Sequence, residues 1–218
     1  GDVGGVVGAT HDPVAAAVNQ LLQDTAGRLW LSHAEGVTCY DGSSVFHFSD
    51  ADGLPHQFMS AMAQDADGCL WFAADASFAF AHCGVCRFDG GTFAHYTVAD
   101  GLPADAVHCL LATAAGELWA FTDRGPAVLR DGRFQPPVHR GGRPPGRVLS
   151  ARQDAAGRLW MAGHDGLCTY DRGVYQWCTF APAPPQRLML GSLEDRHGDV
   201  WAGTLRAVTS GLLQRPRI

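Results

Sequence analysis

A tryptophan that recurs at a nearly fixed interval is the strongest constraint on the fold of this chain. Five of the six tryptophans follow a glycine, one variable residue and a Leu or Val. An Asp stands three residues before that glycine in four of the five copies, and the third copy has Thr113 instead. A period of about forty residues is typical of an array of structural repeats. The repeat tryptophans are Trp30, Trp71, Trp119, Trp160 and Trp201, with spacings of 41, 48, 41 and 41 residues.

A recurring glycine supplies a second fixed point and locates one insertion. Gly36, Gly84, Gly125 and Gly166 each stand 35 residues before the next repeat tryptophan. The distance from a repeat tryptophan to the following glycine of this set is 6, 13, 6 and 6 residues. The second unit therefore carries seven additional residues (13 − 6) between Trp71 and Gly84.

Each unit is predicted to form four short strands. In the first unit these strands cover residues 18–23, 29–31, 37–40 and 45–48. Asp24 to Gly27 is a turn, because Asp bonds to its own backbone and Gly accepts a positive φ. Asp41 and Gly42 favour a tight hairpin turn. Four strands per repeat of about forty residues predict the blade of an all-β propeller with five blades.

We expect one propeller domain over residues 1–218, with blade units at approximately 14–55, 56–103, 104–144, 145–185 and 186–218. The fifth unit has no recognisable fourth strand. Two arrangements are open: the Gly-rich residues 4–8 close a five-bladed ring as an outer strand of the last blade, or the units are a fragment of a larger propeller. Closure is slightly favoured, although Gly-rich residues make a poor strand.

Composition and charge exclude several classes of partner. Hydrophobic residues make up 46% of the chain and charged residues 17%, which suits a folded domain. The net charge is −6 and Lys and Arg do not cluster, so no nucleic acid is expected. No apolar run is long enough to be a membrane segment. The seven cysteines are scattered, and we expect them to be free buried thiols.

The combined motif resembles the two-component regulator propeller repeat. Its parts are D-x-x-G-x-L-W, then G-[VL]-x-x-[YF]-D-G, an aromatic strand and D-G-L-P, and residues 88–103 hold the closest stretch. The resemblance covers roughly residues 14–212. It implies the ligand-sensing, extracytoplasmic or periplasmic part of a bacterial hybrid histidine kinase or related signal-transduction receptor. Streptogramin lyases carry similar Gly-x-x-Trp blades and are the enzyme alternative, although they lack the D-G-L-P link.

Residues that recur in every unit are assigned a structural role. The repeated Asp caps its turn, and the repeated Trp packs between neighbouring blades. Cys83 and Cys86 form a Cys-x-x-Cys pair with His82 beside it, but zinc needs a fourth ligand. A c-type haem needs a His where Arg87 stands. We therefore expect no metal and no cofactor.

Non-repeated polar residues gather in the loops between the second and third strands, which strand alternation places on one face of the disc. Because loops on a rigid scaffold carry function, a ligand is expected on this face, next to the insertion and its two phenylalanines. The alternative that these phenylalanines cap the core stays open. The candidate ligand-binding residues are His33, Asp75, Phe78, Phe80, His82, Asp123, Arg124, His164, Asp165 and Arg206.

Binding is favoured over catalysis, and no catalytic residue is assigned, because spacing alone cannot arrange loops of different blades. The expected partner is a neutral or acidic small molecule such as a saccharide, or a loop of a protein partner. A lyase or hydrolase on the same scaffold predicts a His close to an acid. A protein-interaction scaffold predicts docking on the ring face or its edges.

Overall fold

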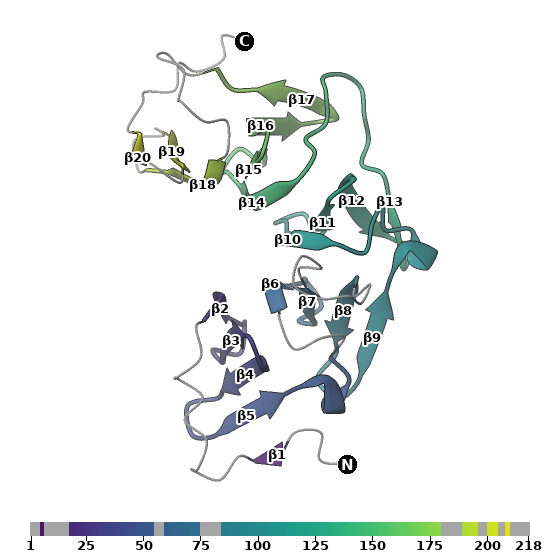
Figure 1. The fold of residues 1–218 in the computed structure, drawn as a ribbon, viewed down its shortest axis with the longest axis vertical. Coiled ribbons are helices and arrows are strands. Elements are labelled where there is room, and N and C mark those ends of the chain that lie inside the picture. Colours follow the sequence, from purple (N-terminus) through teal and green to yellow (C-terminus); the bar gives the residue numbers. More distant parts are fainter. Residues whose placement is uncertain are drawn as a thin grey trace.

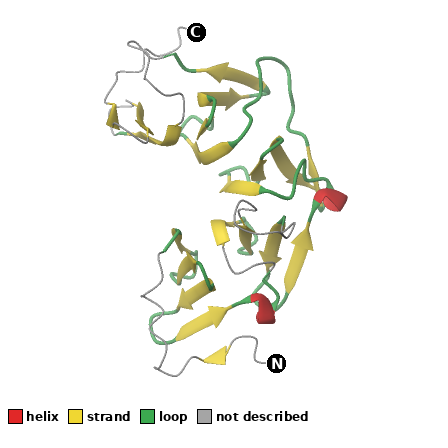
Figure 2. Ribbon diagram, in the orientation of Figure 1, coloured by secondary structure: helices red, strands yellow, loops and turns green. Residues whose placement is uncertain are grey.

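Five antiparallel sheets follow one another along an open arc in the computed structural model (Figure 1). The structure describes residues 5–6, 18–54, 59–74, 84–179, 189–195, 200–204 and 208–209. The first strand of each sheet lies on the concave side of the arc and the last on the convex side (Figure 1). In the described residues, helix is confined to two three-residue 3-10 turns, η1 (Asp50–Asp52) and η3 (Val98–Asp100) (Figure 2). The predicted five-bladed, all-β architecture is confirmed.

The strands of each blade pair in chain order, from the inside of the arc outward. The first blade holds β2 (Gln20–Gln23), β3 (Leu29–His33), β4 (Gly36–Tyr40) and β5 (Val45–Phe48), and β1 (Gly5–Val6) joins its outer edge. The second holds β6 (Met59–Gln64), β7 (Leu70–Ala74), β8 (Val85–Phe88) and β9 (Phe93–Tyr96). The third holds β10 (Val107–Ala112), β11 (Leu118–Thr122), β12 (Gly125–Arg130) and β13 (Arg133–Gln135). The fourth holds β14 (Val148–Gln153), β15 (Leu159–Gly163), β16 (Gly166–Asp171) and β17 (Val174–Trp177). The fifth holds β18 (Met189–Glu194), β19 (Val200–Thr204) and β20 (Val208–Thr209).

The repeated Asp does more than cap its turn. Asp24 Oδ1 accepts the backbone N–H groups of Ala26 and Arg28 at 3.0 and 2.9 Å. Asp24 Oδ2 accepts the indole N–H of Trp30 at 2.8 Å, so one carboxylate fixes both the turn and the ring. Asp65, Asp154 and Asp195 hold their own tryptophans in the same way.

The third blade reaches the same result with different residues. Thr113 Oγ1 accepts the backbone N–H of Glu117 at 3.1 Å and so takes over part of the turn. Glu117 Oε2 accepts the indole N–H of Trp119 at 3.2 Å, and its other oxygen accepts from Arg130 at 2.9 Å. A buried indole N–H needs an acceptor, and Glu117 supplies the one that Thr113 lacks.

Four of the five repeat tryptophans lie buried between blades, as predicted. The first contacts Phe72 and Phe88 of the second blade, and the same tryptophan-to-next-blade packing recurs along the arc. The prediction is wrong for Trp201, which is 41% exposed. In the part of the chain that the structure describes, no further blade packs on its side of the fifth sheet (Figure 1).

The D-G-L-P link places a leucine between two blades. Asp100 accepts the backbone N–H of Thr97 at 2.9 Å and closes a capping box around η3. Gly101 then takes φ 98°, and a Cβ there would meet the carbonyl oxygen of Phe134 at 2.0 Å, so only glycine fits. Leu102 is buried in the core between the second and third blades.

Residues 4–8 were predicted to close the ring, and the structure describes two of them, Gly5 and Val6. For these two residues the prediction is wrong. Gly5 and Val6 form β1, which pairs antiparallel with β5 of the first blade through Gly5–His47 and Val6–Phe46. The strand therefore widens the first blade instead of completing the last one. The first and fifth blades stand at opposite ends of the arc and do not meet (Figure 1).

Candidate functional site

A cavity of about 260 Å³ lies where the inner strands of four blades converge. In each of these four blades the lining residues belong to the first strand or, for Asn19, directly precede it, and they lie no further along than its fourth residue. Both polar and apolar residues line the wall. The lining residues are Asn19, Gln20, Ala61, His108, Cys109, Leu110, Leu149, Ser150 and Ala151.

A β-bulge shapes this wall. The register of the first strand pair shifts near the start of β6, β10, β14 and β18, leaving one unpaired residue in each. In β10 and β14 the unpaired residues are His108 and Leu149, and both line the cavity. Bulges bend a strand and re-aim a side chain, and here they turn these two residues toward the axis.

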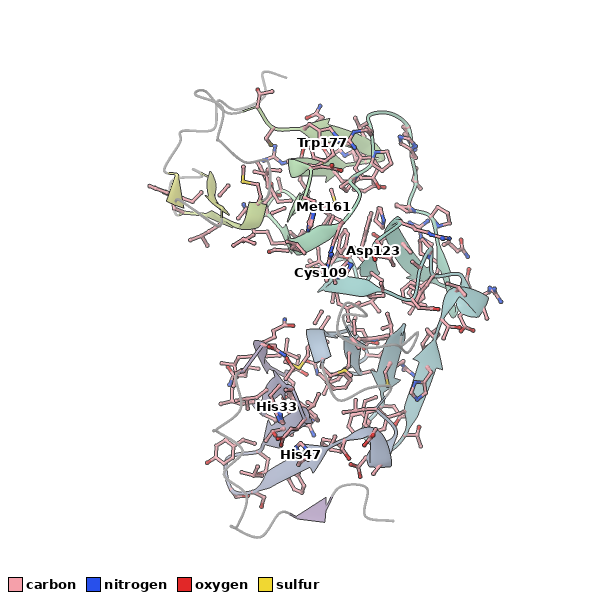
Figure 3. The ribbon with its side chains drawn as sticks, viewed as in Figure 1. His33, His47, Cys109, Asp123, Met161 and Trp177 are labelled. Atoms are coloured by element: carbon pink, nitrogen blue, oxygen red, sulfur yellow. The ribbon has the colours of Figure 1, made fainter. Side chains whose placement is uncertain are left out.

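His108 is held between two charged residues. Its Nε2 lies 2.7 Å from Asp123 Oδ1, and its Nδ1 lies 3.3 Å from a terminal nitrogen of Arg147. Asp123 belongs to the loop after β11 of the same blade, whereas Arg147 immediately precedes β14 of the next blade. The imidazole is almost fully buried, with 2% of the side chain exposed, while half of the Asp123 side chain faces solvent. Figure 3 labels Asp123 and Cys109 in the third blade.

These contacts fix the tautomer of His108. The Arg147 guanidinium can only donate, so Nδ1 must be the acceptor and carry no proton. The proton of the neutral ring is then on Nε2 and is donated to Asp123. Both ring nitrogens are thus occupied, so His108 could act as a general base only after one of these contacts had opened.

Amide side chains join the first two blades at the cavity wall. Gln20 donates to the carbonyl oxygen of Met62 at 3.2 Å and accepts the backbone N–H of the same residue at 2.6 Å. Asn19 donates to the carbonyl oxygen of Met59 at 3.2 Å. These bonds tie the first strand of the first blade to that of the second blade at the cavity wall.

The cavity contains no activated thiol. Burial raises the pKa of Cys109 to about 12, against a smaller opposing effect of a backbone hydrogen bond from Ala151. The thiol therefore stays protonated and is a poor nucleophile. Cys86 is fully buried in the core between the first two blades, where burial raises its pKa to about 12, and its sequence partner Cys83 lies outside the described residues. No group of three or more potential metal ligands occurs among the residues that the structure describes.

The predicted ligand-binding residues are dispersed. Asp123 contacts the cavity histidine, and Arg124 beside it is exposed. His164 is exposed, and Asp165 accepts hydrogen bonds from Arg143 and from the backbone of Gly146. Asp75, Phe78, Phe80, His82 and Arg206 lie outside the described residues.

His33 is not a loop residue, because it is the last residue of β3 and is buried. Its Nε2 lies 2.9 Å from Thr38 Oγ1, which also lies 3.3 Å from His47 Nδ1. The two imidazole rings stack with their centroids 5.3 Å apart. Figure 3 labels both histidines in the first blade. His33 therefore belongs to a polar cluster within the first blade, away from the cavity.

The sequence prediction missed His108 and Arg147, although the repeat holds a signal for the first. The position eleven residues before each repeat tryptophan is occupied by Asn19, Ser60, His108, Leu149 and Leu190. The residue type at this position differs between blades, so the position is not one that the blade structure requires to be conserved among the repeats. Nothing in the sequence indicates that it projects into a cavity, since the bulge itself is not visible there.

The fold places the chain in the class of β-propellers, and comparisons with known proteins agree. The family model described as two component regulator propeller matches residues 53–76, which confirms the resemblance seen in the repeat. A comparison with curated proteins finds no match.

Among solved structures, the chain is similar to the extracellular domain of a hybrid two component system from B. thetaiotaomicron, with 17% identity over 91% of this chain and 27% of that one, and a TM-score of 0.72. It is similar to PorZ, a surface component of the type-IX secretion system of Porphyromonas gingivalis, with 18% identity over 92% and 33% and a TM-score of 0.68. It is also similar to a catalytically inactive virginiamycin B lyase from Staphylococcus aureus, solved with quinupristin, with 13% identity over 88% and 64% and a TM-score of 0.65. The chain thus spans about a quarter of the first protein, a third of the second and under two thirds of the last. Likeness at these identities shows the propeller fold alone.

No helix among the described residues has the length and apolar character needed to cross a bilayer.

Proposed function

We propose that this chain is a ligand-binding propeller that forms the extracytoplasmic sensor portion of a bacterial signal-transduction receptor. The observation that carries the proposal is the cavity built from the inner strands of four blades. A ligand held there touches several blades at once, so its binding can alter how they pack. The match to the two component regulator propeller model supports the signalling context.

The cavity favours a small, uncharged or acidic molecule such as a saccharide. Its volume is slightly below the range of about 300–1,000 Å³ that is usual for ligand pockets, which suits a ligand the size of one sugar ring. Amide, hydroxyl and imidazole groups next to Leu and Ala side chains match the mixed polar and apolar faces of a sugar. Asp123 is the carboxylate that contacts the cavity histidine, and Arg147 Nε lies 3.8 Å from Asp123 Oδ1. Because this carboxylate already has a cationic neighbour, the wall does not favour a positively charged ligand.

The test is a thermal-shift screen with a panel of neutral and acidic monosaccharides and disaccharides. We expect at least one sugar to raise the unfolding temperature of the wild-type chain, because a ligand that binds only the folded state stabilises it. Ser150→Phe fills the cavity and should abolish that shift, while Ser43→Phe, on an exposed hairpin, should retain it. A panel without any effect, or a shift that survives Ser150→Phe, contradicts the proposed site.

The second-blade insertion gives a separate test of the predicted ligand face. Deleting residues 76–82 should leave the fold intact, because the other blades lack them. If the shortened chain unfolds, the insertion belongs to the core. If it folds and keeps its sugar-dependent shift unchanged, the insertion takes no part in binding.

A lyase is the second candidate, because His108 lies 2.7 Å from the carboxylate of Asp123. The quinupristin-bound neighbour supplies a probe. Under the binding proposal, chromatography of quinupristin incubated with the chain, with and without divalent cations, shows no conversion. Conversion that disappears in His108→Ala would instead establish catalysis.

A further inference from the structure

The two ends of the arc carry the two halves of one interface. We define the leading face of a blade as the side opposite its repeat tryptophan, and the tryptophan face as the side that bears it. Inside the chain, each tryptophan face packs on the leading face of the next blade, four times over. Among the residues that the structure describes, no blade packs on the leading face of the first blade or on the tryptophan face of the fifth (Figure 1).

The leading face of the first blade follows the plan of the faces that are buried. Strand pairing aligns Leu29 with Leu70, Leu118 and Leu159, which are 2–3% exposed at internal interfaces. On the first blade the same face leaves Leu21 60% and Tyr40 41% exposed. The corresponding residues of the second blade, Met62 and Phe88, are 2% and 5% exposed. The first blade is therefore shaped to be covered by a tryptophan face.

A glutamine adds a polar signature to this interface. Gln64 and Gln153 each donate to a turn glycine of their own blade and accept a backbone N–H from the preceding blade. The donors are Thr25, at 2.8 Å, and Ala114, at 2.7 Å. Gln23 stands at the same position, seven residues before its tryptophan, and donates to Gly27 in the same way. By analogy with Gln64 and Gln153, its Oε1 is the atom that would accept a backbone N–H from a preceding blade.

The fifth blade presents the complementary half. Trp201 is oriented by Asp195 Oδ2 at 3.1 Å, as the buried tryptophans are oriented by theirs. It stands 41% exposed beside its cross-strand partner Leu193, which is 64% exposed. A large, oriented and exposed aromatic ring next to a leucine is typical of an interaction surface.

We propose that the leading face of the first blade docks on the tryptophan face of the fifth blade of a second copy of this chain. The choice of a second copy follows from complementarity, since the two free faces repeat the chemistry of the four internal interfaces. The contact joins different surfaces and is heterologous, so it leads to a ring or a linear assembly instead of a symmetric pair.

Sedimentation velocity of the 218-residue chain over about a hundredfold range of concentration tests this proposal, since association follows mass action. We expect concentration-dependent assembly of the wild type. Leu21→Glu and Trp201→Glu should each be monomeric, and an equimolar mixture of the two should form a one-to-one dimer, because one intact face of each kind remains. Val98→Glu, which places the same charge on an exposed apolar residue of η3, should assemble like the wild type.

If the wild type stays monomeric at all concentrations, the proposal is overturned, and the two faces do not bind each other between copies of this chain. Assembly of either single variant alone, or a mixture that stays monomeric, overturns the assignment of the faces. Gln23→Met keeps the fold and the shape of the face but removes the acceptor. It should raise the dissociation constant about 2- to 10-fold, the effect of one net hydrogen bond.

Discussion

Replacing Asp24 by Asn tests how one carboxylate holds both a turn and a tryptophan. Asp24 Oδ1 accepts two backbone N–H groups, and an amide oxygen can retain both. The amide nitrogen then takes the place of Oδ2, where it faces two donors, the indole N–H of Trp30 at 2.8 Å and Arg28 Nε at 2.6 Å. The variant thus loses the hydrogen bonds from Trp30 and Arg28 to a charged oxygen, and the buried indole N–H is left without an acceptor.

The expected loss of unfolding free energy is about 2–4 kcal/mol, because bonds to charged groups contribute about 1.5–3 kcal/mol each and Arg28 is partly solvated. Burial raises the pKa of the Asp24 carboxyl, but hydrogen bonds from Trp30 and Arg28 outweigh burial, so the net pKa lies below the usual value. This stabilisation is therefore complete above the unfolded pKa of about 3.9 and is lost as pH falls through the folded value.

Urea unfolding of wild type and Asp24→Asn between about pH 3 and pH 7 measures both effects. The difference between the two proteins should be largest at neutral pH and shrink toward low pH. Asp41→Asn is the matched control, since Asp41 caps an exposed hairpin by similar bonds but holds no indole, and its loss should be clearly smaller. Equal losses in the two variants, or a difference independent of pH, would refute the dual role of Asp24.

Three further predictions follow from burial, strain and titration. Trp160→Ala should cost about 3–5 kcal/mol in urea unfolding, whereas Trp201→Ala, at an exposed ring, should cost less than half of that; equal costs would mean that Trp201 is core. Gly36→Ala should be strongly destabilising, because φ is 133° and the new Cβ would meet the Phe48 carbonyl oxygen, while Gly42→Ala, with open space around its Cβ, should be milder. Burial and the neighbouring His47 lower the pKa of His33. The free energy of unfolding should therefore fall as pH decreases below about 6.5, because the unfolded chain binds a proton that folded His33 does not. His33→Gln should flatten this dependence of stability on pH, and an unchanged dependence would exclude His33 as its source.

The framework could be predicted from the sequence because it repeats. Trp30 and its equivalents, the Asp turns and the D-G-L-P links each recur at fixed spacing, so one interpretation of the pattern applies to every blade. The indole bond to Asp24 was not predicted, since spacing shows which residues recur but not which atoms they join. Glu117 could not be foreseen either, because it replaces a missing Asp from a different position.

The site was harder to predict for a physical reason. The cavity depends on how the inner strands of four blades converge. No local sequence pattern shows how far apart these strands lie. His108 points inward because of a β-bulge, and Arg147 reaches it from the next blade. Asp123 was among the predicted residues because it is polar and not repeated. His33 met the same criterion, yet the structure buries it within its own blade.

Mapping of backbone amide chemical shifts in the isotope-labelled chain tests the central claim most directly. The sugar with the largest effect in the thermal-shift screen is titrated into the protein. The account predicts that the perturbed amides cluster at residues 19–20, 61, 108–110 and 149–151, which line the cavity, and that those of the outer strands β5, β9, β13 and β17 stay unchanged. Perturbations confined to the outer strands, or none at saturating sugar, would contradict a binding site on the propeller axis.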